Sequence, residues 1–396
     1  MKTVLYITYD GLTDALGQSQ VLAYLTRLSQ QDMRIIILSY EKIEKLENGK
    51  RDIEGAISGK NIIWVPLSYT KKPPVISTYL DIVRGKAKAS KLFREYNFSI
   101  VHCRGYIAAI IGLFLQKKFG VKFIFDMRGW WPDEKLEAGF WDKKTYKPVY
   151  HYFKKLEKTF FNKADFIVSL TEAGKKEIIS QNPVLSNKIG VIPTCVDFTL
   201  FKPYNGVVRD KIRAELQIPD EVKVLIYSGS LGGNYDTNVI LKIFEIFSVR
   251  FPKSHLLLLS KDKLPDNEIA SIKRSKDITI TSSPFNKVSD YLMAGDAGLI
   301  IYKPAFSVIG RSPTKLGEYW ASGLPVISLT GIGDLEALYN NYESGGILLQ
   351  PDLSDIDAKM QELSFPDRNQ LRENAKDYYD VERGVAFYHG VYNKVL

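Results

Sequence analysis

Short runs of β-branched and aromatic residues alternate with helix-length amphipathic segments along most of this chain, and this alternation constrains the fold more than any other feature. Strands separated by helices predict βαβ units, whose strands lie parallel in one sheet. The runs form two sets, which are separated by the proline-containing stretch that ends near Gly206. The predicted strands are 3–9, 35–39, 62–65, 100–103, 123–126 and 166–169 in the first set, and 222–227, 256–259, 278–281, 298–302, 325–328 and 346–349 in the second.

The chain has 396 residues, which suits two domains of roughly 100 to 200 residues each. Prolines and turn residues interrupt the pattern between Val191 and Gly206, just before a new helix begins near Val208. We therefore expect an α/β protein with two Rossmann-like halves that meet near residue 200. The last stretch, 369–396, reads as helix with a break near Tyr379.

Composition excludes several classes of protein. Hydrophobic residues make up 45% of the chain and charged residues 25%, as in an ordinary folded soluble protein. The first ten residues lack the length and cleavage site of a signal peptide, and the longest other apolar run, near 107–115, falls well short of the roughly 20 residues that span a bilayer. We expect a cytoplasmic protein, with peripheral contact at the inner face of the membrane left open.

The net charge and the cysteine positions limit which partners, metals and cross-links are expected. The formal charge of +9 favours anionic partners, which include nucleotide phosphates, nucleic acid and an acidic membrane surface. Cys103 and Cys195 have no neighbouring Cys or His at the spacing of a zinc site. Neither a disulfide nor a zinc site is expected.

The segment from Ser312 to Glu318 is the strongest candidate site. Serine at a helix N-cap and proline at the first helical position predict a short helix after a loop. Its N–H groups, the hydroxyls of Ser312 and Thr314, and the charge of Lys315 would suit a diphosphate, while Glu318 would suit two ribose hydroxyls. A plain capped helix with Lys315 and Glu318 in solvent fits the spacing equally well.

Two further loops follow predicted strands. After the first strand, Gly11 and Gly17 permit close backbone approach, and a helix predicted to start near Gln18 would offer free N–H groups to an anion. In the second half, residues 228–235 lead into a helix at about Thr237. A bare strand–turn–helix is the alternative for the first loop, which lacks the Gly-x-Gly-x-x-Gly fingerprint of dinucleotide binding.

Taken together, these segments resemble family 4 glycosyltransferases of the GT-B fold. The run Ser-Pro-Thr-Lys-Leu-Gly-Glu-Tyr at 312–319, followed by Ala-Ser-Gly-Leu-Pro-Val-Ile at 321–327, is similar to their donor-site signature, and 9–20, 229–233 and 191–201 resemble their other characteristic segments. The resemblance spans the chain. It implies two doubly wound parallel-sheet domains facing a cleft: an acceptor-side domain at 1–200, a nucleotide-sugar domain at 201–375, and a C-terminal helix, 376–396, that crosses back to the first.

The function implied by this resemblance is sugar transfer with retention of configuration, from a nucleotide-diphosphate donor to a hydroxyl of a glycan or lipid-linked glycan, as in bacterial surface-polysaccharide synthesis. A UDP-sugar is favoured over a GDP-sugar. No cofactor is expected, since the nucleotide-sugar is a substrate, and no metal is expected, since helix ends and lysines would neutralise the phosphates. The Asp355-x-Asp357 sequence matches the Asp-x-Asp of metal-dependent transferases with a different fold, but it falls at the start of a predicted polar helix. The alternatives are a nucleotide-sugar epimerase of the same fold and a non-catalytic sugar-binding protein. A nucleic-acid-binding protein is a third alternative, but no nucleic-acid partner is expected.

Candidate residues follow from the motifs and from the resemblance. The expected catalytic residues are Asp126, Lys315 and Glu318; the expected donor contacts are Gly17, Gly229, Gly232, Gly233, Lys261, Arg311, Ser312 and Thr314, together with Lys315 and Glu318; and the expected acceptor contacts are Asp10, Gln18, Arg104 and Arg128.

The sequence departs from the family pattern in two places. Relatives often carry a glutamate eight positions before the one at 318, where this chain has Gly310, and many carry an Arg and a Lys shortly after the loop that ends here at Gly233. Lys315, Arg311 and Lys261 are therefore the cations expected to neutralise the diphosphate. What grips the donor sugar in place of the first glutamate is left open.

Two further features allow more than one interpretation. Asp126 stands where many relatives have a histidine, and with Arg128 it fits either a site or a loop-closing ion pair; His102 fits a site or a buried structural role equally well. Between 130 and 163, aromatic residues interleave with lysines, Lys143 among them. That segment suits an anionic membrane interface, an amphipathic helix facing the core or, least of all, single-stranded nucleic acid.

Overall fold

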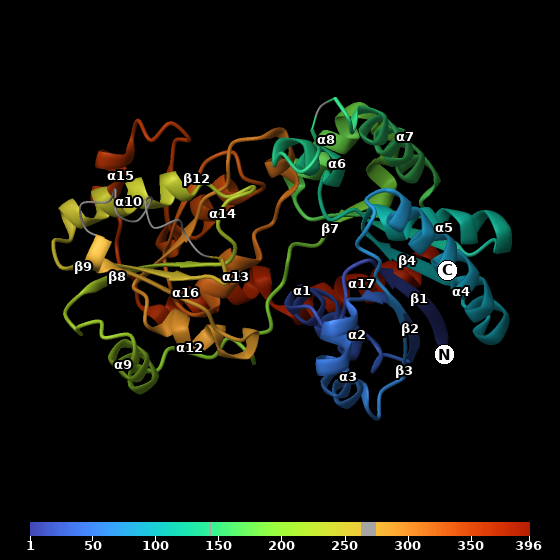
Figure 1. Cartoon of the computed structure of the whole chain (residues 1–396), viewed down its shortest axis with the longest axis horizontal. Coiled ribbons are helices and arrows are strands. Elements are labelled where there is room, and N and C mark those ends of the chain that lie inside the picture. The colour runs from blue at the N-terminus through green and yellow to red at the C-terminus, as the bar shows by residue number, and fades with distance from the viewer. Residues whose placement is uncertain (143, 263–274) are drawn as a thin grey trace. The chain divides into compact units, whose positions relative to one another are not determined.

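The structure is a computed structural model that describes residues 1–142, 144–262 and 275–396, and its described part divides into two compact units (Figure 1). The first unit comprises Met1–Leu136, Phe140–Pro193 and Val381–Leu396, and the second comprises Glu137–Gly139 and Thr194–Asp380. Each unit is built on a parallel sheet with alternating helices, which confirms the predicted α/β class. The predicted domain limits at 200 and 375 stay predictions.

In the described residues of the first unit, a seven-stranded sheet has the order β3-β2-β1-β4-β5-β6-β7. The strands are β1 (Lys2–Thr8), β2 (Met33–Glu41), β3 (Ile62–Ser68), β4 (Ile100–Arg104), β5 (Lys122–Asp126), β6 (Phe166–Ser169) and β7 (Ile189–Val191). The sequence predicted all but β7, which it treated as part of the connection between domains. This strand pairs with β6 through Ile167 and Ile189, and Gly190 leaves room there for the ring of Phe387.

The helices of the first unit pack on this sheet and on one another. Helix α5 packs on β4 and β5, and both α4 and α7 pack on α5. The C-terminal helix α17, red in Figure 1, packs on α2 in the same unit. The helices are α1 (Ala15–Gly17), the π-helical turn η1 (Gln18–Leu22), α2 (Ala23–Leu28), α3 (Ile43–Ile57), α4 (Ile76–Tyr96), α5 (Gly105–Phe119), α6 (Trp131–Glu137), α7 (Lys147–Lys163), α8 (Glu172–Gln181), the 3₁₀ turn η2 (Pro183–Lys188) and α17 (Val381–Val395).

The described part of the second unit contains a six-stranded parallel sheet in the order β10-β9-β8-β11-β12-β13. Its strands are β8 (Lys223–Ser228), β9 (Ser254–Leu259), β10 (Ile278–Thr281), β11 (Ala297–Ile300), β12 (Val326–Leu329) and β13 (Gly346–Leu349). All of them match predicted runs. Because β8 lies between β9 and β11, the chain reverses its winding direction at β8, and ligands of doubly wound sheets bind at the carboxyl ends of the strands at such a point.

The helices of the second unit surround a core of apolar side chains that are almost wholly buried. Trp320 is a fully buried member of this core, and its indole N–H donates to the carbonyl of Gly345 at 2.9 Å, so the buried nitrogen is satisfied. The helices are α9 (Gly206–Glu215), α10 (Thr237–Arg250), α12 (Val288–Met293), α13 (Thr314–Ala321), α14 (Leu335–Asn341), α15 (Ile356–Glu362) and α16 (Arg368–Tyr379), with 3₁₀ turns η3 (Ser275–Asp277), η4 (Phe285–Lys287), η5 (Phe306–Gly310) and η6 (Glu343–Gly345).

Candidate active site

Helix α13 starts differently from the sequence prediction. It begins at Thr314, and Pro313 occupies the cap position with an extended backbone and no side-chain cap. The predicted N-cap role of Ser312 is therefore wrong. Since Pro313 is itself extended, the Ser312 side chain is one residue too early to reach the first turn; its hydroxyl accepts from the Thr194 N–H at 3.1 Å, and its carbonyl accepts from the Thr194 hydroxyl at 2.7 Å.

Lys315, in the first turn of α13, lies between two tyrosine rings. Its Nζ is 4.3 Å from the centre of the Tyr227 ring and 3.9 Å from that of Tyr235, and it donates to the Tyr227 hydroxyl at 3.1 Å. Burial lowers the pKa of Lys315, while Tyr235 and Glu318 act in the opposite direction. The rings fix the position of the ammonium group, because each presents its negative face to the cation.

The loop after β8 is fitted closely to this lysine. A Cβ on Gly229 would lie 2.5 Å from both Cε and Nζ of Lys315, and the Gly229 φ of +135° strains any other residue. The neighbouring Ser228 N–H donates to the Tyr319 hydroxyl of α13 at 2.8 Å. Gly232 and Gly233 have left-handed φ values of +74° and +61°, and α10 then starts at Thr237, as predicted.

Glu318 lies one turn after Lys315 on α13 and is partly buried. Burial raises its pKa to about 7, against the opposing effect of the Lys315 charge. The carboxyl group is therefore poised between its neutral and charged forms near neutral pH. When charged, it can accept hydrogen bonds from two hydroxyl groups at once.

Arg311 lines a small pocket of about 210 Å³ in the same unit, together with Gly233 and Asn234. Its guanidinium lies 4.8 Å from the centre of the Tyr302 ring. Lys303 and Glu137 also line this pocket, and the Glu137 carboxylate accepts from the N–H of Ser307 at 3.2 and 3.3 Å. Two cations and one carboxylate thus surround a space next to the glycine loop.

The second unit brings together most of the residues that were predicted to bind a donor. Those within this region are Gly229, Gly232, Gly233, Arg311, Ser312, Thr314, Lys315 and Glu318. Lys261 follows β9 at the same edge and is exposed, while its neighbour Asp262 accepts from the Leu231 N–H at 2.9 Å. Sequence reasoning missed Tyr227, Tyr235, Lys303 and Glu137, because they are distant along the chain and form no spaced motif.

In the first unit, Asp126 is fully buried at the end of β5. Its Oδ2 accepts from the Tyr388 hydroxyl at 3.1 Å and lies 3.6 Å from Nε2 of His102, whose Nδ1 is 2.7 Å from the Tyr392 hydroxyl. Burial opposes ionisation, but Arg128 and His102 hold the pKa of Asp126 below its usual value, while burial lowers the pKa of His102. Oδ1 of Asp126 finds no hydrogen-bond partner among the described residues.

Three of the predicted acceptor residues gather at the carboxyl ends of β1, β4 and β5, which are neighbours in the sheet. Arg104 is buried and its Nε donates to Asp10 Oδ2 at 3.2 Å, while within the described chain its Nη1 has no hydrogen-bond partner. Arg128 has a left-handed φ of +59°, and one of its nitrogens lies 3.8 Å from Asp126. Two arginines and two aspartates therefore meet at this edge of the first sheet.

The fourth predicted acceptor residue, Gln18, is placed differently. The helix starts at Ala15 and not near Gln18, and the Gln18 N–H donates to the carbonyl of Asp14 at 3.0 Å. The expectation that this N–H is free for an anion is therefore wrong. Gly17 lies inside the helix, where a Cβ would be 2.0 Å from the Gly11 carbonyl oxygen, so it serves the packing of the first turn against the loop.

Glu41, at the end of β2, is a residue that sequence reasoning missed. It is fully buried, and its carboxylate accepts from the N–H groups of Leu12 and Thr13 at 2.7 and 3.2 Å and from the Thr13 hydroxyl at 2.6 Å. It thereby fixes the loop that follows β1. A glutamate at a strand end is normally solvated, so only the three-dimensional contacts reveal this role.

The aromatic and basic segment from 130 to 163 divides between the core of its unit and the surface. Trp130, Phe153, Phe160 and Phe161 are buried, and Lys154 pairs with Asp133 at 2.9 Å. Phe140 and Tyr152 remain exposed. Lys143 lies outside the described residues.

No set of three or more metal-ligating side chains gathers within the described ranges. Asp355 accepts from the Gln350 N–H at 2.9 Å, and Asp357 lies in the first turn of α15. Cys103 and Cys195 are both buried, and neither forms a disulfide. Among the described helices, none combines the length and the hydropathy that crossing a bilayer requires.

Sequence comparison decides the family. Residues 17–200 match the profile described as Glycosyltransferase Family 4. The part of the chain from 17 to 200 is therefore identified as a family 4 glycosyltransferase domain. Over 380 residues this transferase is 19% identical to a D-inositol 3-phosphate glycosyltransferase from Thermomonospora curvata, a match that covers 91% of this chain and 85% of the relative.

Solved structures agree with this glycosyltransferase in fold. Sucrose-phosphate synthase from Thermosynechococcus elongatus superposes with a TM-score of 0.72 at 13% identity, over 100% of this chain and 99% of the other. HepE from Anabaena, in complex with UDP and glucose, superposes with a TM-score of 0.68 at 10% identity, over 99% and 100% of the two chains. At these identities the likeness establishes the GT-B fold alone.

Proposed function

We propose that this glycosyltransferase moves a sugar, with retention of configuration, from a UDP-sugar to a hydroxyl of a glycan or lipid-linked glycan in cell-surface polysaccharide synthesis. The observation that carries the donor part is Lys315, held between Tyr227 and Tyr235 at the start of α13 and against the glycine loop. The fold likeness to HepE, which binds UDP and UDP-glucose, supports uridine as the base.

In this proposal the second unit binds the donor diphosphate. Lys315, Arg311 and the first-turn N–H groups of α13 neutralise its charge, and the Glu318 carboxylate accepts hydrogen bonds from the ribose hydroxyls. As the bond between the sugar and the diphosphate breaks, negative charge grows on the leaving group, and these fixed donors stabilise it. The leaving diphosphate takes the proton of the acceptor hydroxyl as the new glycosidic bond forms.

The first unit supplies the acceptor side of the same proposal. Asp10, Arg104 and Arg128 lie at one edge of its sheet, where they would hold acceptor hydroxyls or an acceptor phosphate. Asp126 has one carboxylate oxygen without a hydrogen-bond partner in the described part of the chain, and that oxygen would bind the acceptor or the donor sugar. Gln18 contributes through its side chain, since its N–H is used within the helix.

Glu137 supplies the carboxylate that the sequence lacks at Gly310. It lines the pocket that also holds Arg311, and it caps η5, the turn that ends at Gly310. A donor sugar next to the diphosphate would lie beside this carboxylate.

The variant Glu137→Gln keeps an oxygen that accepts from the Ser307 N–H but loses the negative charge. Affinity for the UDP-sugar should therefore fall, while affinity for UDP stays the same. An equal loss of affinity for both ligands, or a loss for neither, would reject the assignment.

Removal of the Lys315 charge tests the donor site. Lys315→Ala should lower turnover by roughly 10²- to 10³-fold, the usual effect of losing one such group. Lys253→Ala, at a side chain that is 74% exposed, is the matched control and should leave turnover unchanged. The measurement is release of UDP together with product analysis by mass spectrometry; near-normal turnover of Lys315→Ala would sink the donor assignment, and conversion of the donor sugar without any acceptor would indicate an epimerase.

A further inference from the structure

Helix α4 exposes a row of large apolar side chains. Ile76, Tyr79, Leu80 and Val83 are 57%, 64%, 49% and 45% exposed. Their spacing places them on one side of the helix, since residues three and four apart are neighbours on a helix surface. Single exposed apolar residues are common, but a contiguous row of this kind marks an interaction surface.

Basic residues border this row, and exposed acidic residues are almost absent from it. Asp81 is the only acidic residue from 69 to 94, and it is fully buried, where it accepts from the Tyr9 hydroxyl at 2.8 Å and pairs with Arg84. The net charge offered by this part of the first unit is therefore positive. The cations in the same stretch are Lys71, Lys72, Arg84, Lys86, Lys88, Lys91 and Arg94.

The turn before α4 presents another apolar side chain. Val75 has φ +69° and ψ −56°, and the Ile76 N–H donates to the Pro74 carbonyl at 2.8 Å, which together form a γ-turn of the rare, strained kind. A β-branched residue is strained at positive φ, yet here it holds a side chain that is 48% exposed. Strain of this kind is typical of functional surfaces.

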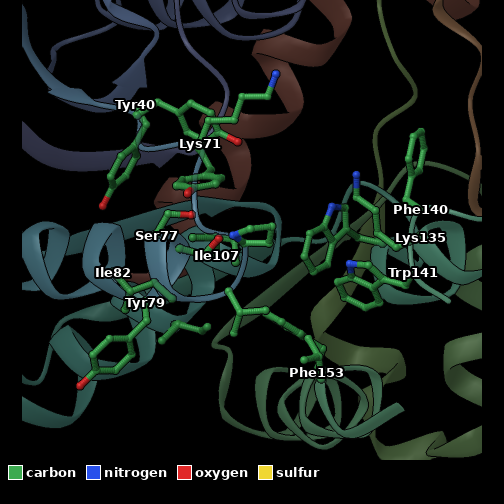
Figure 2. A pocket seen from close by; sticks show the side chains of 18 of the residues that line it. Tyr40, Lys71, Ser77, Tyr79, Ile82, Ile107, Lys135, Phe140, Trp141 and Phe153 are labelled. Carbon is green, nitrogen blue, oxygen red and sulfur yellow. The ribbon is translucent and has the colours of Figure 1, made fainter. Parts of the chain in front are cut away.

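A large pocket of about 890 Å³ adjoins the same row. Figure 2 shows Tyr79 and Lys71 on one side of it, with Phe140, Lys135 and Trp141 on the opposite side. The pocket continues to the loop at 9–11, which includes the candidate acceptor residue Asp10. Its aromatic walls and flanking lysines suit an amphipathic molecule with an apolar chain and an anionic head.

We propose that the α4 face, formed by Lys71, Lys72, Val75, Ile76, Tyr79, Leu80 and Val83, docks on an anionic lipid surface, and that the adjoining pocket receives a lipid-linked acceptor there. Apolar side chains flanked by lysines are the pattern of an interfacial helix, in which the apolar row enters the headgroup boundary and the lysines attract anionic lipids. A tyrosine suits that boundary, because one end is apolar and the other is polar. Binding of a lipid-linked acceptor in the pocket rests on the proposed function, whereas docking of the α4 face on the lipid surface does not.

Binding to lipid vesicles tests whether the α4 face docks on an anionic lipid surface. The full chain is sedimented with phosphatidylcholine vesicles, with and without phosphatidylglycerol. The expected result is binding only when phosphatidylglycerol is present, weakened by salt, and at least tenfold lower partitioning of the triple variant Ile76→Ser, Leu80→Ser, Val83→Ser. The matched control is Val207→Ser with Val249→Ser, two side chains of the second unit that are 79% and 80% exposed.

The possible outcomes separate the alternatives. Docking of the α4 face is contradicted if the wild-type chain does not bind phosphatidylglycerol vesicles, or if the triple variant binds them equally well. Docking on lipid is also contradicted if the wild-type chain binds no vesicles but self-associates with rising concentration, and the triple variant does not. The α4 face would then bind a second copy of the chain. Thermal stabilisation by UDP should be the same in wild type and triple variant; its absence in the wild type, beside normal vesicle binding, would reject the proposed function and leave docking intact.

Binding of dodecyl phosphate tests whether the pocket receives a lipid-linked acceptor. Dodecyl phosphate, kept below its micelle concentration, is titrated while tryptophan fluorescence is followed, because Trp131 and Trp141 line the pocket. We expect a saturable change with dodecyl phosphate, none with inorganic phosphate, and a smaller change in Trp141→Phe. Identical fluorescence changes with the two phosphates, or no change with either, would contradict binding of a lipid-linked acceptor in this pocket.

Discussion

Gly229 and Lys315 depend on each other at the scale of single residues. The Gly229 backbone has a φ of +135°, which strains other residues, and a methyl group there would meet the Cε and Nζ of Lys315 at 2.5 Å. Gly229→Ala should therefore displace the ammonium from its place between the rings and weaken UDP binding about tenfold, or ~1.4 kcal/mol. Titration calorimetry measures this directly.

Gly206→Ala provides the control, because that glycine starts α9 with nothing within 4 Å of an added Cβ and without a positive φ. It should bind UDP like the wild type. Unchanged UDP affinity in Gly229→Ala would show that the position of Lys315 does not matter for the nucleotide.

Glu318 should make donor binding depend on pH. Burial raises its pKa to about 7, so the charged form that accepts two ribose hydroxyls grows as the pH rises through that value. We expect affinity for the UDP-sugar to increase from about pH 6 to about pH 8 in the wild type, more than in Glu318→Gln. Since the folded state binds this proton more tightly than the unfolded state, its contribution to the free energy of unfolding should fall as the pH rises from 4.5 to about 7.

The variant Glu318→Gln also corrects for titration of the ligand itself. Parallel pH profiles of wild type and variant, measured by calorimetry and by denaturant unfolding, would contradict the assignment. Sequence alone predicted Lys315 and Glu318 as a pair on one helix, but both pKa shifts come from burial, which the spacing does not reveal. Tyr235, which no spacing rule links to position 315, opposes the lowering of the Lys315 pKa.

At the scale of elements, the hydrogen bond from the Ser228 N–H to the Tyr319 hydroxyl joins α13 to the end of β8, where the glycine loop begins. Tyr319→Phe leaves that buried N–H without its acceptor, which should lower the free energy of unfolding by about 1–3 kcal/mol. It should also weaken UDP binding, since the loop and helix would no longer be held in register. Denaturant unfolding and calorimetry check both effects.

Tyr152→Phe is the matching control, since Tyr152 is 54% exposed and should tolerate loss of its hydroxyl. If Tyr319→Phe loses stability but binds UDP normally, the hydrogen bond supports the fold and not the site.

Elements with strong periodicity were predicted well, and their exact starts were not. All strands of the second sheet matched predicted runs, because buried parallel strands are short, β-branched and bounded by turns. Strand β7 was missed because three residues give no period. The start near Ser312 was wrong because the Ser312 hydroxyl bonds to Thr194 and not to the first turn. The start near Gln18 was wrong because the helix already begins at Ala15, so the Gln18 N–H makes an ordinary intrahelical hydrogen bond to the Asp14 carbonyl.

At the scale of the whole molecule, two parallel sheets and their helices followed from the alternation of the sequence, and the family from motifs that lie far apart along the chain. What the sequence could not provide were contacts between distant segments. Glu137 beside Arg311, Glu41 beneath the first loop and the exposed row on α4 each depend on which side of an element faces solvent or a neighbour.

The central claim is that α13 and the loop after β8 form a nucleotide-diphosphate site, and thermal unfolding with UDP, GDP or ADP tests it most directly. A ligand at about 100 times its dissociation constant adds roughly 2.7 kcal/mol of stability. We predict that UDP raises the melting temperature of the wild-type chain more than GDP or ADP does, and that Lys315→Ala loses most of that rise. A wild-type chain that none of the three stabilises, or a Lys315→Ala variant that UDP stabilises as fully as the wild type, would contradict the claim.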